Sequence, residues 1–451
     1  MKKMDIYNHL PVWAQNMACW WEGRNLKKAR FGSSFRQALA EYENHNDWSY
    51  EQMCDYRDAQ LRKLVRHSYD TTIYYRKLFD EGGINPDSIK TLDDLKRIPI
   101  LKKATIMENP GLFLSSAYSP DSLVDVATSG STGSCLVLHV SPDNIARQYA
   151  IWWRYRRRLG IDMDMWHAEF GSRIIVPPQQ KKPPYWRISY PLKQEMFSAF
   201  HGNASTYRLY FEEIRRRGYH WFHFTPSVFV PFASFCLEND LHLDRNPDFI
   251  TAGAENLYDF QRKIVHDAFG VWPRTHYGLT EAVANFSETP DGVMEVDEDF
   301  GAVEFVPDGE SCHIIGTSLI NYAMPLIRYD TADIATVSQK VGQRGRIVDR
   351  IDGRNGDCIY LPDGTHVATL SALFTGTKNI VEAQIHQQQD YSLVIRYVPK
   401  NEQYADDLEL VKNMLVDRIG SHTVPFSFVR MEKLPRTARG KLRYIVSDVK
   451  R

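Results

Sequence analysis

Features typical of secreted, zinc-stabilised and membrane-spanning proteins are missing from this chain of 451 residues. Its six cysteines lie far apart and never form Cys-x-x-Cys, so we expect neither a disulfide framework nor a zinc site. No run of eighteen apolar residues occurs, and the first residues lack the uninterrupted apolar core of a signal peptide. These absences predict a cytoplasmic protein in a reducing compartment.

An excess of charge of either sign is missing too. The chain has 55 Lys and Arg against 56 Asp and Glu, a net charge of −1, and no basic patch accompanies a nucleic-acid-binding motif. We therefore expect no nucleic-acid partner. Its 43% hydrophobic and 25% charged residues are typical of a soluble globular protein. The length allows roughly two to four structural units.

A Walker loop is absent, but another glycine-rich loop is present. Residues Thr128–Gly133 contain two glycines and four hydroxyl side chains, between short apolar segments. Such a backbone can curl tightly and present N–H and O–H donors together, which favours an anion-binding loop. Gly133 is followed by Ser134 and Cys135 rather than by Lys and Ser or Thr, so a Walker-type kinase or ATPase is disfavoured. A polar surface turn between two strands is the alternative.

Strands and helices alternate between residues 220 and 281, which predicts parallel α/β layers. The carboxyl ends of parallel strands gather on one side of a sheet, so we expect the polar segments 251–255 and 276–281 to converge. From 292 to 337 the pattern changes to short alternating strands, typical of a small antiparallel, barrel-like unit.

The glycine-bearing stretch Asp352–Asp357 is a predicted joint. The expected fold class is α/β, with a large N-terminal region of layered α/β subdomains and a small β-barrel-like unit, followed by a small mobile α+β C-terminal domain. The predicted domains are residues 1–352, a hinge at 353–357 and residues 358–451.

An aromatic stripe recurs at helical spacing near the N-terminus, at Trp13, Met17, Trp20 and Trp21. It is followed by the basic residues Arg24, Lys27, Lys28 and Arg30. A stripe of this kind can lie on a membrane surface. We expect it instead to cover the core of its own domain, as aromatic stripes on helices usually do, and we expect no membrane association.

A second basic cluster ends the predicted helix 143–159, at Arg154, Arg156, Arg157 and Arg158. These guanidinium groups could bind a phosphate. The helix dipole, however, favours cations at a C-terminus, where they normally face water. We therefore expect the whole cluster to be solvated.

Five motifs in register resemble the adenylate-forming superfamily of acyl-CoA synthetases, peptide-synthetase adenylation domains and luciferases. They lie at residues 128–133, 252–255, 276–281, 328–333 and 434–443. Tyr74-Tyr75-Arg76, the stretch Ile98–Lys103 and the Arg328-Tyr329 pair look most like the phenylacetate-CoA ligase branch, especially its CapK-like capsular-polysaccharide-biosynthesis members.

The resemblance implies a set of nucleotide-binding residues. The loop around the ATP phosphates would be Thr128, Ser129, Gly130, Ser131, Thr132 and Gly133. The adenine would be flanked by Gly253, Ala254, Glu255 and Tyr277, and the ribose hydroxyls would meet Asp333, assisted by Arg354.

The resemblance also implies catalytic roles. Thr280 would meet the α-phosphate, Glu281 would hold Mg²⁺, and Lys441 would reach the carboxylate and the α-phosphate from the C-terminal domain. Gly356 stands at the hinge. His201 and Gly278 are candidates for the acyl pocket, with a structural role as the alternative for His201.

Two departures from the family pattern matter. Asp330 stands where the branch often has a basic residue, which weakens any phosphate or substrate contact assigned there. After the glutamate motif, Asn285–Glu288 offers no thiolate where some relatives have a cysteine-rich metal site, so we expect no structural zinc.

The implied activity is ATP-dependent conversion of a small carboxylic acid to an acyl-adenylate, with release of pyrophosphate and transfer of the acyl group to coenzyme A. The implied cofactors are ATP or AMP, Mg²⁺ and coenzyme A. One alternative is transfer to a carrier protein, an amine or a sugar hydroxyl of a polysaccharide precursor. A second, of another class, is a degenerate nucleotide-binding scaffold, against which the intact Glu281, Asp333 and Lys441 argue.

Overall fold

The computed structural model describes residues 3–128, 136–309, 311–354, 359–362, 366–367, 373–374, 377–419, 424–436 and 442–449. The chain forms two compact units. Unit 1 comprises residues 1–25, 161–275 and 352–451, and unit 2 comprises residues 26–160 and 276–351. No helix in the described ranges is both long enough and apolar enough to cross a bilayer.

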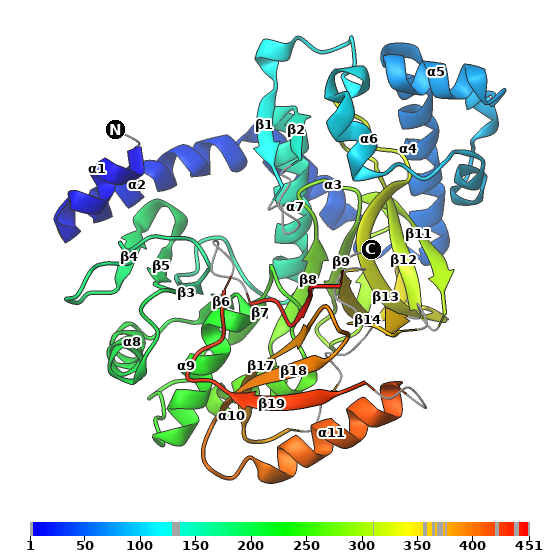
Figure 1. The fold of residues 1–451 in the computed structure, drawn as a ribbon. Coiled ribbons are helices and arrows are strands. Elements are labelled where there is room, and N and C mark those ends of the chain that lie inside the picture. Colours follow the sequence, from blue (N-terminus) through cyan, green and yellow to red (C-terminus); the bar gives the residue numbers. More distant parts are fainter. Residues whose placement is uncertain are drawn as a thin grey trace. The chain divides into compact units, whose positions relative to one another are not determined.

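Unit 1 contains a sheet whose inner strands are parallel, as the alternation of strands and helices predicts. Its pairing order is β4 (Trp186–Ser189), β5 (Gln194–Phe197), β3 (His167–Phe170), β6 (Trp221–Phe224), β7 (Phe249–Ala252) and the first residues of β8 (Arg274–Gly278). The helices between these strands, which lie beside them in Figure 1, are α8 (Ala204–Arg217), α9 (Pro226–Glu238) and α10 (Asp259–Phe269). Phe222, Phe224, Phe229 and Phe269 are buried in their shared core.

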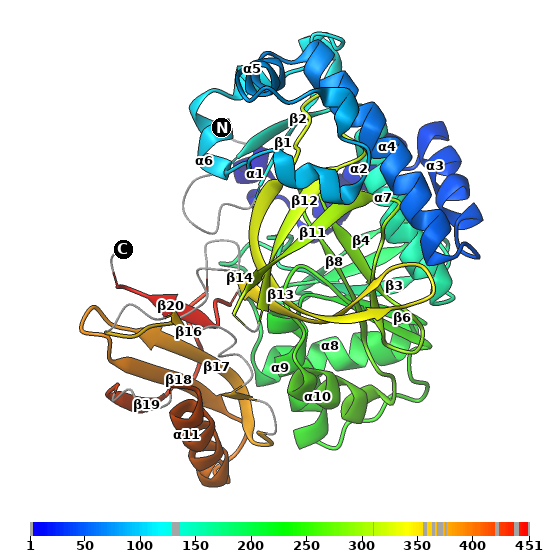
Figure 2. The same cartoon turned by 90° about the vertical axis from the view of Figure 1, so that its right-hand side faces the viewer.

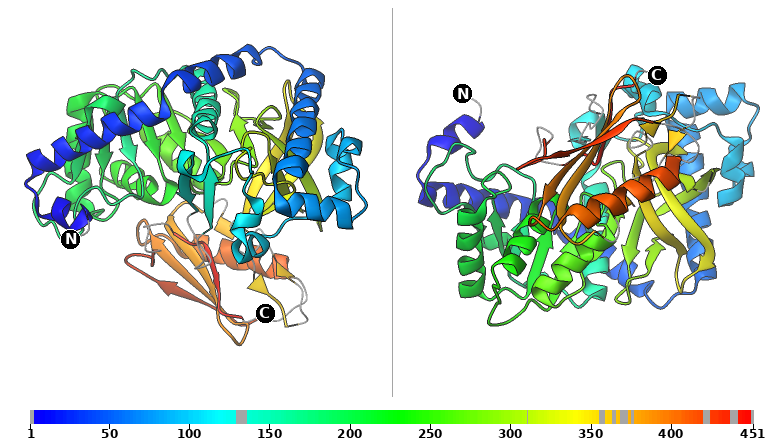
Figure 3. Two further views of the ribbon diagram at one scale, coloured as in Figure 1. Left: turned by 90° about the horizontal axis from the view of Figure 1, so that it is seen from above. Right: turned by 60° about the horizontal axis from the view of Figure 1, so that its bottom comes forward.

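The C-terminal part of unit 1 is the α+β element expected from its sequence. Four strands pair in the order β19 (Phe426–Arg430), β18 (Leu393–Pro399), β17 (Ile380–Gln387) and β20 (Ile445–Ser447). Helix α11 (Ala405–Ile419) runs along these strands (Figure 3). It buries Val411 and Leu415 with Ile385 and Ile395. A two-residue pair, β15 (Ile359–Tyr360) and β16 (His366–Val367), precedes them.

Unit 2 carries most of the helices that precede strand β3. They are α3 (Ser33–Asn44), α4 (Tyr50–Thr71), α5 (Ile73–Glu81), α6 (Lys103–Glu108) and α7 (Pro142–Arg158). Short 3-10 turns lie at η1 (Pro86–Ser88), η2 (Leu92–Arg97), η3 (Pro110–Phe113) and η4 (Pro120–Ser122). A separate hairpin is formed by β1 (Val124–Ala127) and β2 (Val137–Val140).

The sheet of unit 2 is antiparallel, which confirms the change of pattern expected after residue 292. The strands are β9 (Asn285–Glu288), β10 (Met294–Val296), β11 (Gly301–Asp308), β12 (Ser311–Ser318), β13 (Tyr329–Val341) and β14 (Arg346–Arg354). Their order is β11-β12-β13-β14-β10-β9-β8. The long strands β11 to β13 curve together in Figure 2. The fold class is therefore the mixed α/β one expected. The division into a body, a hinge and a mobile domain concerns movement and stays a prediction.

The expectation that the N-terminal aromatic stripe covers a core is wrong. Helix α2 (Val12–Arg30), which follows α1 (Lys3–His9), carries it, and the only buried described residues of α2 are Gln15 and Gly23. Trp13, Met17 and Trp21 are 66%, 63% and 60% exposed. Polar residues hold the inner face of α2 instead, so the aromatic side chains point outward.

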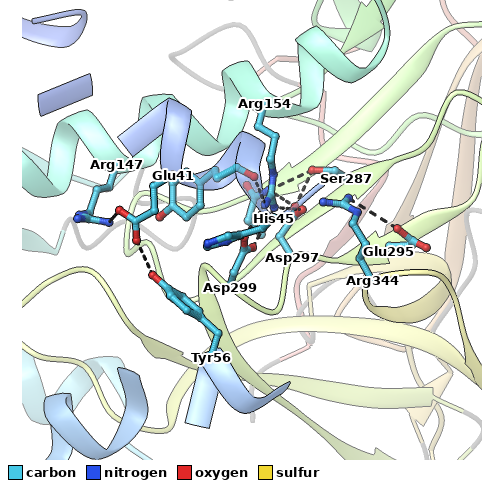
Figure 4. A network of polar contacts seen from close by, with 12 residues as sticks. Glu41, His45, Tyr56, Arg147, Arg154, Ser287, Glu295, Asp297, Asp299 and Arg344 are labelled. Carbon is cyan, nitrogen blue, oxygen red and sulfur yellow. Dashed lines mark hydrogen bonds and ion pairs between the residues drawn. The ribbon is translucent and has the colours of Figure 1, made fainter. Parts of the chain in front are cut away.

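The expectation that the whole arginine cluster of α7 is solvated is wrong for Arg154. Its guanidinium is buried and donates hydrogen bonds to both oxygens of Asp299, at 2.5 and 2.9 Å, and to Asp297 Oδ1 at 2.7 Å (Figure 4). The other oxygen of Asp297 accepts hydrogen bonds from Ser287 Oγ and Asn285 Nδ2, each at 2.6 Å. His45 Nδ1 lies 2.8 Å from Asp299 Oδ2. Arg154 therefore joins α7 to the segment between β10 and β11.

Candidate functional site

The hairpin β1-β2 carries the predicted phosphate loop. Thr128 joins the two ends of this loop, because its backbone N–H donates to the Leu136 carbonyl at 2.8 Å while the Leu136 N–H donates to Thr128 Oγ1 at 3.1 Å. The loop residues Ser129, Gly130, Ser131, Thr132 and Gly133 lie outside the described residues. Their role stays a prediction.

Two motifs that are distant in sequence meet at Tyr277 and Asp333. The Tyr277 hydroxyl donates a hydrogen bond of 2.7 Å to Asp333 Oδ2. Burial, and then the charge of Asp333, raise the pKa of Tyr277 well above its ordinary value, so the phenol stays a donor. The Tyr277 ring stacks on Phe286, with centroids 4.8 Å apart. The structure thus brings together one residue assigned to the adenine, Tyr277, and one assigned to the ribose, Asp333.

The predicted metal ligand Glu281 is also held by a tyrosine. Tyr329, from the Arg328-Tyr329 motif, donates its hydroxyl to Glu281 Oε1 at 3.1 Å. Sequence reasoning assigned no role to the Tyr329 side chain. Thr280, the residue before Glu281, is partly exposed. Glu281 and Asp333, the acids that the family resemblance assigns to Mg²⁺ and to the ribose, therefore both lie in unit 2 and both accept a hydrogen bond from a phenol.

Gly278 is exposed and lies against a partly buried hydrogen bond. Trp152 Nε1 donates to Asn285 Oδ1 at 3.1 Å, and a Cβ added at Gly278 would stand 3.0 Å from that oxygen and 3.1 Å from that nitrogen. The next residue, Leu279, accepts a hydrogen bond of 2.7 Å at its carbonyl from Gln148 Nε2. A side chain at position 278 would therefore disturb how the segment before Glu281 is held.

An alanine in the left-handed region, where residues other than glycine are uncommon, lies within or directly after three of the motifs. These alanines are Ala254 (φ 68), Ala282 (φ 54) and Ala332 (φ 58). Each directly follows or precedes a predicted site residue, namely Glu255, Glu281 or Asp333. Such a conformation costs about 1 kcal/mol, and residues held in strained conformations concentrate at functional sites. These three alanines thus lie beside predicted site residues, while Lys193, Asp240 and Tyr391 adopt the same conformation outside the motifs.

The adenine motif of unit 1 follows strand β7. Its Gly253 N–H donates to the Phe224 carbonyl at 3.0 Å. The Glu255 carboxylate accepts hydrogen bonds of 2.9 Å from both the backbone N–H and the hydroxyl of Ser227, in the first turn of α9. A carboxylate at a helix N-terminus satisfies free N–H groups and favours the helix dipole. The Glu255 side chain therefore fixes its loop to α9.

His201 has the contacts of a structural histidine. Its Nδ1 lies 2.7 Å from Ser198 Oγ, its Nε2 lies 3.1 Å from the Gln180 carbonyl, and its ring stacks on Tyr185. Burial lowers the pKa of His201 below its ordinary value, which favours the neutral ring. These contacts support a structural role for His201, while its role in an acyl pocket stays a prediction.

Two branch-specific motifs pair with each other. The Leu101 N–H donates to the Arg328 carbonyl at 2.8 Å, and the Asp330 N–H donates to the Leu101 carbonyl at 2.9 Å. Next to them, Lys102 Nζ lies 2.6 Å from Asp330 Oδ2. Asp330 thus has a protein cation as its partner. No periodicity in the sequence predicts this pairing, since the two motifs lie far apart along the chain.

The remaining candidates cannot be placed. Gly356 and Lys441 lie outside the described residues, and of Arg354 only the backbone, at the end of β14, is described. Among the residues that are described, no group of three or more His, Cys, Asp or Glu is arranged to hold a metal ion.

Known proteins match this chain over different lengths. Residues 359–448 match the family model described as the CapK C-terminal domain. The protein CapK of Staphylococcus aureus is 24% identical over 456 residues, which cover 99% of each chain. The phenylacetate-coenzyme A ligase of Escherichia coli (strain K12) is 24% identical over 336 residues, which cover 69% of this chain and 74% of that one.

Solved structures of CoA ligases share the fold. A crystal structure of 2-hydroxyisobutyryl-CoA ligase in the postadenylation state, in complex with R3-HIB-AMP, superimposes with a TM-score of 0.66 at 17% identity, and the match covers 89% of this chain and 91% of that one. At this identity the likeness establishes the fold alone.

Proposed function

Because this chain belongs to the adenylate-forming superfamily, as a CapK-like member of the phenylacetate-CoA ligase branch, we propose that it activates a carboxylic acid with ATP. A carboxylate oxygen of the acid attacks the α-phosphorus, the bond to pyrophosphate breaks, and an acyl-adenylate forms. The thiol of coenzyme A then attacks the acyl carbon, and AMP leaves. The observation that best supports this proposal is the pairing of Asp333 and Glu281 with tyrosine hydroxyls in unit 2.

The first step needs charge control and no general base, because a carboxylic acid is already ionised at neutral pH. Negative charge gathers on the phosphate oxygens in the transition state, where preorganised donors act strongly. In this proposal the loop from Thr128 to Gly133, Thr280 and Lys441 supply those donors. Asp333 receives the ribose hydroxyls, and its bond from Tyr277 holds the carboxylate in one orientation.

Glu281 suits the role of a magnesium ligand, although it is a single carboxylate. Mg²⁺ is usually bound by one or two carboxylates together with substrate phosphates and water, so a cluster of protein ligands is not needed. A carboxylate can accept one hydroxyl and still ligate a cation. When bound, Mg²⁺ would neutralise charge on the phosphates.

Coenzyme A is the proposed acceptor because relatives with this fold are named as CoA ligases. The same adenylate could instead be attacked by a carrier-protein thiol, an amine or a sugar hydroxyl. The acceptor acts only after adenylation, so the two steps can be tested separately.

The decisive experiment is acid-dependent exchange of labelled pyrophosphate into ATP, screened over aryl, fatty, hydroxy and amino acids. We expect at least one acid to support exchange. Acids that do so are then offered with coenzyme A, amines and sugars. If no acid supports exchange while ATP still binds, the chain is a nucleotide-binding scaffold and the proposal is wrong.

A lysine substitution tests the mechanism within that assay. We expect Lys441→Ala to lower pyrophosphate exchange by about 10²-fold or more, the scale expected for removing a charged transition-state contact. Consumption of added acyl-adenylate by coenzyme A should change little. Lys412→Ala, at a surface lysine paired with Glu409, is the control and should keep full activity. If both half-reactions fall equally in Lys441→Ala, the proposed role is incorrect.

A further inference from the structure

Helix α2 lies with its polar side toward the protein and its aromatic side toward solvent. On the inner side, the buried Gln15 accepts a hydrogen bond of 2.7 Å from Arg187 Nε and donates to the carbonyls of Tyr7 and Leu10 at 3.1 and 3.0 Å. The Ile188 N–H donates to Asn16 Oδ1 at 3.2 Å. A surface helix normally does the reverse and buries its apolar side.

Turning the inner side of α2 toward solvent would cost free energy. Gly23 sits so close to strand β4 that a Cβ there would overlap the Ser189 hydroxyl. Arg187 is fully buried, and removing Gln15 would leave part of its guanidinium without a partner. An unsatisfied buried charged group is costly. The orientation of α2, and so the exposure of its outer side, is therefore set by buried polar contacts.

The outer side of α2 is a single continuous stripe. At 100° per residue, the aromatic stripe and three of the four basic residues that follow it fall within roughly 120° of one another around the helix axis, whereas Arg30 lies outside this sector. The members are Trp13, Met17, Trp20, Trp21, Arg24, Lys27 and Lys28, all of them exposed. We call this set the α2 stripe. Its first two turns are apolar and its last turns cationic.

The cations of the α2 stripe are available to a partner. Among the residues that the structure describes, no carboxylate forms an ion pair with Arg24, Lys27 or Lys28, and the Arg24 guanidinium lies over the Trp20 ring at 5.7 Å. Tryptophan side chains and basic residues on one helix face are what an interfacial helix presents to lipid headgroups. The α2 stripe therefore presents both the aromatic side chains and the cations that bind to the surface of an anionic bilayer.

We propose that the α2 stripe binds the surface of a bilayer that contains anionic lipids. The tryptophans enter the headgroup region and the basic residues contact lipid phosphates. The proposal concerns a helix lying on the membrane, and it is compatible with the finding that no described helix could span one.

A second copy of this chain fits the α2 stripe less well. If two stripes packed in parallel, Lys27 and Lys28 of both copies would face each other, and like charges repel. If they packed antiparallel, Trp13 and Met17 would face Lys27 and Lys28, and part of the apolar surface would meet charge. A planar anionic surface accepts both halves of the stripe at once.

Co-sedimentation with vesicles tests the proposal on the full chain. We expect binding to vesicles in which phosphatidylcholine is mixed with anionic phosphatidylglycerol, and much weaker binding to vesicles of phosphatidylcholine alone. Binding should be lost at high salt, which screens the charges. A basic residue near an anionic surface contributes about 5-fold to binding. Lys27→Gln with Lys28→Gln should therefore weaken binding by roughly 30-fold.

Matched variants control for general effects of the substitutions. We expect Trp13→Ser with Trp21→Ser to weaken binding more than tenfold, because the buried aromatic area is lost. The control for this variant is Trp272→Ser, at a tryptophan that is 49% exposed outside α2. The control for the lysine variant is Lys181→Gln with Lys182→Gln, an exposed tandem pair in a loop. All variants should keep the thermal midpoint within a few degrees, since the side chains are exposed.

Three results would overturn the proposal. The first is equal sedimentation with neutral and anionic vesicles. The second is loss of binding in the control variants to the same degree as in the α2 stripe variants. The third is a dimer in light scattering that becomes a monomer in Trp13→Ser with Trp21→Ser, which would assign the stripe to a second copy. None of these results depends on pyrophosphate exchange, so the outcome is independent of the proposed function.

Discussion

Single residues at the candidate site are held in place before any ligand arrives. Asp333 and Glu281 each accept a hydrogen bond from a tyrosine hydroxyl, and each lies next to a left-handed alanine. Strained backbone and fixed side chains cost stability and persist where the surrounding structure enforces them. At the residue scale, the protein maintains two carboxylates in defined orientations.

The first prediction concerns the bond between Tyr277 and Asp333. We expect Tyr277→Phe to raise the KM for ATP several-fold to tenfold while kcat changes little, because in the proposed site the lost hydrogen bond would orient Asp333 toward the nucleotide in both ground and transition states. The ring, its stacking on Phe286 and the fold are retained. The measurement is pyrophosphate exchange at varied ATP concentration.

Tyr190→Phe is the control for this variant, since the Tyr190 side chain is 55% exposed and lies outside the motifs. Its KM for ATP and its kcat should match those of the unmodified protein. A Tyr277→Phe variant with an unchanged KM for ATP, or with a reduced kcat alone, would remove the Tyr277–Asp333 pair from the nucleotide site.

At the scale of elements, buried charge joins helix α7 to the sheet of unit 2. Arg154 binds Asp297 and Asp299, and Arg57 and Arg346 bind Glu298 between them. Burial raises the pKa of Asp297, whereas at Asp299 the Arg154 charge and the His45 contact outweigh burial and lower the pKa. The Arg154 charge therefore favours the ionised form of Asp299 despite its burial.

The second prediction tests that connection with one substitution at two positions of α7. We expect Arg154→Met to lower the free energy of unfolding by about 3–5 kcal/mol, because two buried carboxylates lose their cation. Arg157→Met, on the same helix, should cost less than about 1 kcal/mol, since Arg157 forms a surface pair with Glu43. Thermal unfolding at pH 7 compares the two.

The pH dependence distinguishes lost charge from lost packing. In the unmodified protein, the lowered pKa of Asp299 gives stability that is present above about pH 4 and lost as the pH falls through the folded pKa. In Arg154→Met both carboxyl pKa values should rise, so the variant gains stability as the pH falls and these groups take protons. The deficit should therefore shrink from pH 7 to pH 5. A deficit that does not change with pH would indicate lost packing alone.

At the scale of the whole molecule, the proposed chemistry requires movement. Lys441 must reach the α-phosphate during adenylation, yet the acceptor needs access to the same acyl carbon afterwards. A C-terminal domain that changes place between the two steps resolves this conflict. The segment 353–357, with two glycines, is where we place the joint.

The third prediction follows from that joint. Proline restricts φ to a narrow range and removes an N–H, whereas glycine reaches conformations closed to other residues. We expect Gly356→Pro to slow one half-reaction far more than the other, while the thermal midpoint stays within a few degrees. The first half-reaction is measured as single-turnover adenylation. The second is measured separately, as acyl transfer from added acyl-adenylate to coenzyme A.

Gly356→Ala is the matched control, because alanine keeps the N–H and a wider range of φ, and its effect should be smaller. Equal and small effects of Gly356→Pro on both half-reactions would mean that the joint lies elsewhere or that no large rotation occurs.

Much of the fold and part of the site follow from local sequence. The parallel layers of residues 220–278 could be predicted because strand and helix periodicities are local properties of a chain, and the antiparallel strands after residue 292 could be predicted for the same reason. The motifs around Asp333 and Glu281 could be found because their order along the chain resembles a known family. The buried polar contacts of Asn285, Asp297 and Arg154 could not be predicted from the sequence, since each of these residues has its hydrogen-bond partner in another element.

The sequence by itself determined the order of elements and the position of the motifs, and with them the family resemblance. Only the tertiary structure decided which side of each helix faces inward, and it reversed two expectations. Arg154 is buried because Asp297 and Asp299, which come much later in the chain, compensate its charge, and helix periodicity carries no information about such a partner. The tryptophans of α2 face solvent because Gln15 and Gly23 fit strand β4 and the indole rings do not. Hydrophobic periodicity identifies the faces of a helix, whereas the surface it packs against selects the face that is buried.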